Sequence, residues 1–228
     1  MRRRSRQGAS AIEFAFSLLF LIPLFLGLTG IGISMLRQLQ TVQLARDAGA
    51  MSARKVDFTL LGSQQILNRV AGSLGLTVTT GSGGSSNTAG VAGAGNAVVI
   101  LSTIQYVTAA VCNQGGYTYP PGTCTNYQNW VFTKRVVVGN NTLRTSNLGT
   151  PTGLTTAVDA AGGIALADQC TTAGDRVTGT NPWTSSTIAA DALAVIQVQP
   201  IYVSEAAAVG FRLPPFSSGT TVYAQLYF

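Results

Sequence analysis

The sequence predicts an α+β protein in which a long N-terminal helix leads into a β-rich region. Residues 14–36 form an apolar run of 23 residues without a charge, which is typical of a helix. The second half of the chain holds several short runs of β-branched and apolar residues, which favour strands. We therefore expect a long helix, a second helix and an antiparallel sheet, arranged as an α+β domain.

The apolar run is long enough to cross a membrane. As a helix it would span roughly 34 Å, against a hydrocarbon core of about 30 Å. A cleaved secretory signal has an apolar region of only about 7–15 residues, so we expect residues 9–36 to remain as a transmembrane helix, kinked near Pro23. Four arginines precede the run and favour a cytoplasmic N-terminus and an extracytoplasmic C-terminal region. They are Arg2, Arg3, Arg4 and Arg6.

Composition argues against nucleic-acid binding and against most catalysis. The chain has a net charge of +6, but removing residues 1–8 leaves ten basic and eight acidic residues, without a basic stripe. Histidine is absent, which excludes Ser-His-Asp and Cys-His catalysis and most zinc sites. We expect no enzyme activity, cofactor, metal or small-molecule substrate. Four aspartates without calcium-loop spacing are expected on the solvated surface: Asp159, Asp168, Asp175 and Asp191.

A short motif stands at the start of the apolar run. Gly8 is followed, after four small or apolar residues, by Glu13 and Phe14. If the chain were cut after Gly8, Ala9 would carry a new α-ammonium. Ala9 and Glu13 are four residues apart and share one helix face, so the carboxylate can neutralise that cation. A carboxylate in the first turn also suits the positive end of the helix dipole.

The stretch Arg6–Ala15, RQGASAIEFA, resembles the TadE-like minor pilins, or pseudopilins, of tight-adherence (Tad/Flp, type IVb) pilus systems. The resemblance covers residues 1 to about 40. It implies that residues 1–8 are a basic prepilin leader, removed between Gly8 and Ala9 by a membrane aspartic prepilin peptidase. It also implies a pilin-like fold, and that Glu13 neutralises the N-terminus of its own chain or of a neighbour during assembly.

By this resemblance the protein would be a structural subunit in pilus assembly, adhesion or surface display. Its partners would be the bacterial inner membrane, the prepilin peptidase, other pilin subunits and the Tad assembly machinery. The alternative is an uncleaved, signal-anchored envelope protein with an extracytoplasmic binding domain. The two hypotheses differ at one bond, that between Gly8 and Ala9.

Residues 37–80 are predicted to be an extracytoplasmic helical region. The first helix should continue through residues 37–55, although the apolar positions there do not form one clean stripe. A second helix is expected over 58–74, with Asp57 as N-cap and a stripe that packs on the sheet. The stripe is Leu60, Leu67, Val70, Ala71 and Leu74. Residues 81–95 hold six glycines and predict a flexible loop.

Residues 96–228 are predicted to be a β-rich extracytoplasmic domain. The expected strands are 98–107, 130–138, 142–145 after a turn at 139–141, and 192–198, which Pro200 would stop. The C-terminus alternates as a half-buried strand should, with Val222, Ala224, Leu226 and Phe228 on one face. Residues 146–190 have weak periodicity and yield no assignment.

Three cysteines, Cys112, Cys124 and Cys170, are present and none forms a C-x-x-C pair. In an oxidising compartment this count predicts one disulfide and one free thiol. Proximity in sequence favours Cys112 with Cys124, and Cys124 with Cys170 is the alternative.

Overall fold

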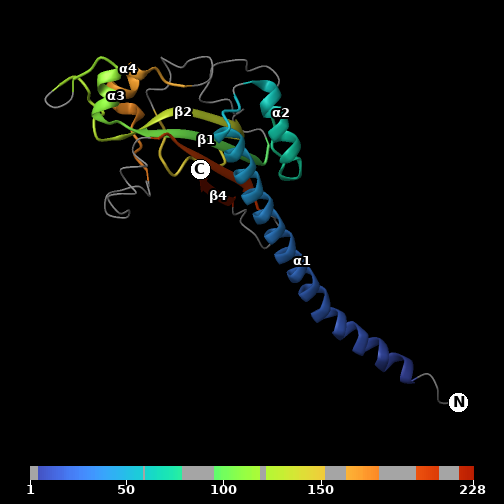
Figure 1. Ribbon diagram of the computed structural model, residues 1–228. Coiled ribbons are helices and arrows are strands. Elements are labelled where there is room, and N and C mark those ends of the chain that lie inside the picture. The colour runs from blue at the N-terminus through green and yellow to red at the C-terminus, as the bar shows by residue number, and fades with distance from the viewer. Residues whose placement is uncertain are drawn as a thin grey trace.

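The computed structural model describes residues 5–58, 60–78, 95–118, 122–151, 163–179, 199–210 and 221–228, with side chains from residue 12 onward. Its helices are α1 (Ser5–Ala53), α2 (Leu61–Val70), η1 (Gly72–Leu74), α3 (Ala109–Gln114), α4 (Leu166–Thr171) and η2 (Ala173–Asp175). Its strands are β1 (Ala97–Tyr106), β2 (Trp130–Gly139), β3 (Ile201–Val209) and β4 (Thr221–Tyr227). The predicted α+β class, with a long N-terminal helix and an antiparallel sheet, is confirmed (Figure 1).

The four strands form one antiparallel sheet in the order β2-β1-β3-β4. The strands expected at 98–107, 130–138 and the C-terminus correspond to β1, β2 and β4. Strand β3, which pairs on both sides and lies at the centre of the sheet, was not predicted from the sequence. The strand expected at 192–198 falls outside the described residues, as does the loop 81–95 except for Gly95.

The strand expected at 142–145 is wrong. That segment forms turns directly after β2. The Asn140 side-chain oxygen accepts hydrogen bonds from the Thr142 backbone nitrogen at 3.1 Å and from the Thr142 hydroxyl at 2.7 Å. Such a local side-chain bond offers the backbone an alternative to a strand ladder, so it ends the strand here.

Helix α1 runs without interruption through Pro23 and far beyond the domain, with the N-terminus at its distant end (Figure 1). Its C-terminal part packs chiefly on β3 and β4. Contrary to the expectation of no clean stripe, this part buries Thr41, Leu44, Ala45 and Ala48 at helical spacing. Near the start of the packed part, the Arg37 guanidinium donates to the Val209 carbonyl oxygen at 2.7 Å, which ties the helix to the end of β3.

The second helix is shorter than expected, and Asp57 does not cap it. Helix α2 starts at Leu61, and the residue at its N-cap, Leu60, makes no side-chain capping bond. The Asp57 carboxylate instead lies 4.0 Å from the Lys134 ammonium on β2. An ion pair to the sheet has therefore replaced the predicted cap.

The predicted apolar stripe of this helix is only partly buried. Leu67, Ala71 and Leu74 lie in the core with α1 and the sheet, as expected, whereas Leu60 and Val70 are 59% and 48% exposed. The buried side is completed by a polar residue, Gln64, whose amide donates to the Phe58 carbonyl oxygen at 2.8 Å.

The sheet has two covered faces, which we call the helix face and the loop face. On the helix face, α1 and α2 cover one end of β1 around Val99 and Leu101, and a cluster that includes α3 and α4 residues covers the other end. On the loop face, Leu143 and Leu148 of the segment after β2 pack on both ends of the sheet.

Of the aspartates expected at the surface, Asp175 is instead fully buried.

Candidate functional site

The sequence motif at the N-terminus lies on the free part of α1. Gly8 and Ala9 have helical backbone, and Glu13 follows Ala9 by about one turn of the same uninterrupted helix. The Glu13 and Phe14 side chains are exposed, Phe14 by 65%. The helix thus places position 9 and the carboxylate on one side of the chain, as the spacing predicted.

The segment that follows the motif exposes apolar side chains in all directions. Large hydrophobic residues from Ile12 to Leu36 are between 40% and 71% exposed, apart from Leu18, which is partly buried. α1 is long and apolar enough to cross a membrane, and its candidate span is not buried inside the protein. A helix that is apolar all round requires lipid or other helices as its surroundings.

Two polar side chains in this segment, Ser17 and Thr29, are satisfied within the helix. The Ser17 hydroxyl donates to the Glu13 carbonyl oxygen at 2.9 Å. The Thr29 hydroxyl lies 3.0 Å from the carbonyl oxygens of both Phe25 and Leu26. Hydrocarbon offers no partner to a hydroxyl, so these bonds to the preceding turn suit a helix in lipid.

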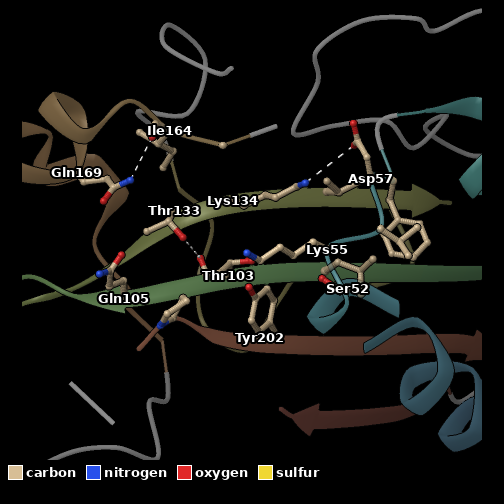
Figure 2. A pocket seen from close by; sticks show the side chains of 16 residues that line it. Ser52, Lys55, Asp57, Thr103, Gln105, Thr133, Lys134, Ile164, Gln169 and Tyr202 are labelled. Carbon is tan, nitrogen blue, oxygen red and sulfur yellow. Dashed lines mark hydrogen bonds and ion pairs between the residues drawn. The ribbon is translucent and has the colours of Figure 1, made fainter. Parts of the chain in front are cut away.

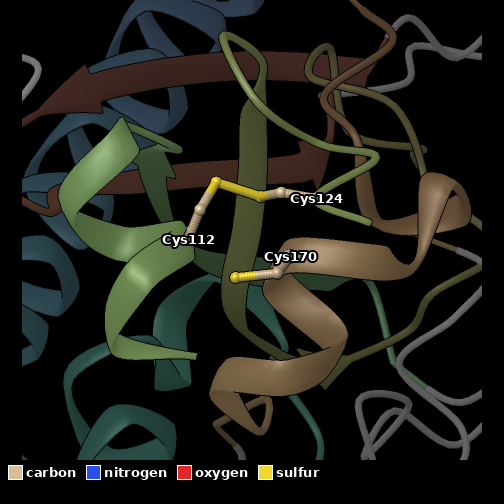
Figure 3. A group of neighbouring side chains, drawn as sticks. All are labelled: Cys112, Cys124 and Cys170. Atoms are coloured by element: carbon tan, nitrogen blue, oxygen red, sulfur yellow. A yellow bond between two sulfur atoms is a disulfide. The ribbon is translucent and has the colours of Figure 1, made fainter. Parts of the chain in front are cut away.

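The three cysteines meet at the end of the sheet where α3 and α4 lie (Figure 3). Cys112 and Cys124 are joined in a disulfide with 5.9 Å between their Cα atoms, which is the first of the two predicted pairings. Cys170 on α4 is buried and free, and all three sulfur atoms lie within 4.8 Å of one another. Burial raises the pKa of the Cys170 thiol and keeps it protonated, so it is a weak nucleophile toward the adjacent disulfide.

A buried polar network, not anticipated from the sequence, lies on the loop face. Glu205 of β3 is 1% exposed. Its carboxylate accepts hydrogen bonds from the Tyr223 hydroxyl at 2.6 Å, from the Asn147 backbone nitrogen at 2.9 Å, and from the Ser146 hydroxyl. The network fastens the segment after β2 to the two strands that pair at this point, and the only sequence signal was a glutamate within an otherwise small or apolar run.

A buried guanidinium belongs to the same region. Arg135 of β2 is 5% exposed and donates to the Gly149 carbonyl oxygen at 3.1 Å. Burial lowers the pKa of Arg135 to about 10, and attraction to Glu205 partly offsets that effect. The guanidinium thus fixes the loop by its hydrogen bond to Gly149 and has the features of a buried structural group, not of an open reaction centre.

Comparison with known proteins finds no family model, curated protein or solved structure that matches this chain. A functional conclusion therefore has to be drawn from the N-terminal motif and from the geometry of the chain itself.

Proposed function

We propose that this chain is a minor pilin, or pseudopilin, of a Tad-type pilus: a structural subunit that acts in pilus assembly, adhesion or surface display. One observation carries the proposal. The motif from Gly8 to Phe14 stands at the start of a long apolar helix that exposes its side chains and continues unbroken into a folded domain. A subunit with this shape can be anchored in a membrane by its helix and present its folded domain outside the membrane.

The proposed activation step is proteolysis. A membrane aspartic prepilin peptidase cuts after Gly8, which removes the arginine cluster and leaves an α-ammonium on Ala9. The Glu13 carboxylate lies one helical turn away and neutralises the cation within the chain or on a neighbour. An ionised group next to hydrocarbon is costly unless it is paired, so both charges favour the paired state.

Pairing between chains would order the subunits. When Glu13 of one chain binds the N-terminus of the next, the contact is head-to-tail, and repeated head-to-tail contacts build an open helical filament. The apolar side chains of residues 12–36 then exchange lipid for the helices of neighbouring subunits. Desolvation strengthens the attraction between the two charges, so the pair sets the register of the helices.

The charge-removing variant Glu13→Gln tests this role. It retains the shape of the side chain, so we expect normal membrane insertion and cleavage but little of the protein in filaments sheared from cells. The matched control is Asp47→Asn, which removes an exposed charge from the same helix outside the apolar segment. The signal-anchor alternative expects no effect from either change, so wild-type pili and adhesion with Glu13→Gln would count against the pilin proposal.

A further inference from the structure

The two lysines of the chain, Lys55 and Lys134, line the same cavity. The other twelve basic residues of the chain are all arginine. Because the two lysines are 79 positions apart in the sequence, only the fold brings them together. The cavity has a volume of about 430 Å³ and lies on the helix face of the sheet (Figure 2). It lies between the end of α1 and the segment that leads into α4. Here the strands are covered neither by α1 and α2 nor by the cluster that includes α3 and α4 residues.

The floor of the cavity is a row of side chains across three strands. Thr103 of β1 is in register with Lys134 of β2 on one side and with Tyr202 of β3 on the other. Directly opposite residues of an antiparallel sheet point to the same face, so all three face the cavity. The pairing of β1 with β2 shifts next to Thr103, and this bulge lets the neighbouring residue Thr133 line the cavity as well.

Lys55 stands at the rim in an uncommon backbone conformation. Helix α1 ends in a Schellman motif, with bonds from the Val56 nitrogen to the Met51 oxygen at 3.1 Å and from the Lys55 nitrogen to the Ser52 oxygen at 2.9 Å. The position of Lys55 in this motif has a φ of 63°, where glycine is the preferred residue. A lysine with a backbone conformation that favours glycine is uncommon, which makes its side chain a candidate for a functional role.

The charged side chains that line the cavity leave one net positive charge, which one anionic group could neutralise. The Lys134 ammonium lies 4.0 Å from the Asp57 carboxylate and is balanced by it. Lys55 is exposed and, among the residues with described side chains, has no carboxylate within ion-pair distance. The other polar groups of the lining are uncharged hydroxyls and amides, from Ser52, Thr103, Gln105, Thr133, Gln169 and Tyr202.

We propose that this cavity binds an acidic saccharide, with a single carboxylate at Lys55 and sugar hydroxyls at the surrounding hydroxyl and amide side chains. A phosphate is disfavoured because one net positive charge and no arginine face the cavity. A polyacidic peptide is disfavoured by the same single charge. The inference does not depend on the pilin proposal, because the site stands whether or not residues 1–8 are removed.

The test is titration of the full chain, in detergent micelles, with a short oligogalacturonate, a neutral galactose oligomer of equal length and an oligoglutamate peptide. We expect the oligogalacturonate to bind and the other two to bind at least about tenfold more weakly, because each lacks either the carboxylate or the hydroxyls. Equal binding of the neutral sugar would overturn the role of charge. Preferential binding of the peptide would overturn the assignment to a saccharide, and absence of oligogalacturonate binding would overturn the site.

The sharpest variant is Lys55→Gly, because its effects on binding and on folding have opposite signs. Glycine relieves the backbone at φ 63°, so we expect the melting temperature to rise while affinity for the oligogalacturonate falls at least about tenfold. Arg54→Gln is the matched control, since it removes the adjacent exposed charge outside the cavity lining and should leave affinity unchanged. Unchanged affinity in Lys55→Gly would refute the proposal.

A second measurement does not require a variant. Both lysines of the chain line the cavity. An amine-specific acetylating reagent therefore modifies only these two side chains and the N-terminal amine. We expect saturating oligogalacturonate to slow acetylation of Lys55, measured by peptide mass spectrometry, and not that of the N-terminus. Equal rates of Lys55 acetylation with and without a bound ligand would place the ligand elsewhere and contradict the proposal.

Discussion

Removing one hydroxyl from the buried network on the loop face should destabilise the protein measurably. The Tyr223 hydroxyl donates to the Glu205 carboxylate at 2.6 Å, and the guanidinium of Arg144 lies 4.1 Å from the centre of the Tyr223 ring. The substitution Tyr223→Phe retains the ring and its contact with Arg144 but deletes the donor. Glu205 then keeps two of its three donors, from Ser146 and Asn147.

The expected loss is that of one hydrogen bond to a charged, buried acceptor. Such bonds contribute about 1.5–3 kcal/mol, and the carboxylate cannot recruit water easily because Glu205 is 1% exposed. We therefore expect Tyr223→Phe to lower the free energy of unfolding by about 1.5–3 kcal/mol at neutral pH.

The same substitution should change the response to alkali. Burial, and then the hydrogen bond to Glu205, raise the pKa of Tyr223 above the ordinary value near 10. Above pH 10 the unfolded chain releases this proton while the folded chain holds it, so the stability present below pH 10 is lost as the pH rises toward the folded pKa. One such group contributes a slope of at most about 1.4 kcal/mol per pH unit, which Tyr223→Phe removes. Tyr106 and Tyr227, whose pKa values are also raised by burial, keep part of the slope.

Urea unfolding of the full chain in detergent, followed by near-ultraviolet circular dichroism at pH 7 and from pH 9 to 11, measures both effects. Tyr202→Phe is the matched control, because no hydrogen bond of its hydroxyl is found within the described structure, and it should change stability by less than about 0.5 kcal/mol. A similarly small change for Tyr223→Phe, with an unaltered alkaline slope, would refute the account of the network.

Two further predictions concern the cysteine cluster and the junction of helix and sheet. Cys112→Ser leaves Cys124 and Cys170, whose sulfur atoms lie within 4.8 Å, so oxidising conditions should join them; peptide mapping that finds two free thiols would contradict this geometry. Leu44→Ala empties part of the core between α1 and the sheet and should cost about 2–5 kcal/mol in urea unfolding. Leu39→Ala, at a position 63% exposed on the same helix, should cost less than about 0.5 kcal/mol, and equal effects of the two would refute the assigned face.

Elements with a strong local pattern could be predicted from the sequence. The apolar run at 14–36 indicates a helix by its length, and α1 contains it. The β-branched residues of β1 and β2 and the alternation of β4 indicate strands for the same local reason. The disulfide between Cys112 and Cys124 was predicted from the count of three cysteines and the short separation of these two in the sequence.

Elements that depend on partners distant in the sequence could not be predicted in this way. β3 contains Glu205 and three consecutive alanines, which are poor strand formers, and it follows Pro200, which reads as a stop. It is a strand because β1 and β4 pair with it on both sides and Tyr223 satisfies its glutamate.

The lysine cavity was missed for a related reason. Lys55 and Lys134 are unremarkable in their local sequence, and only the packing of α1 against the sheet brings them together. Asp57 reads as a helix cap for the same reason, because its partner on β2 is distant in sequence. The scarcity of lysine was visible in the composition, but the sequence alone does not locate the cavity that the two share.

The most direct test of the pilin proposal is the N-terminus of the mature protein in cells with an active prepilin peptidase. Intact-mass and N-terminal peptide spectrometry of membrane and pilus fractions should find a chain that begins at Ala9 and lacks the four leader arginines. The variant Gly8→Val, which blocks the proposed cut, should accumulate at full length in the same cells. A wild-type chain that still carries Gly8 in every fraction would contradict the proposal and favour an uncleaved anchor.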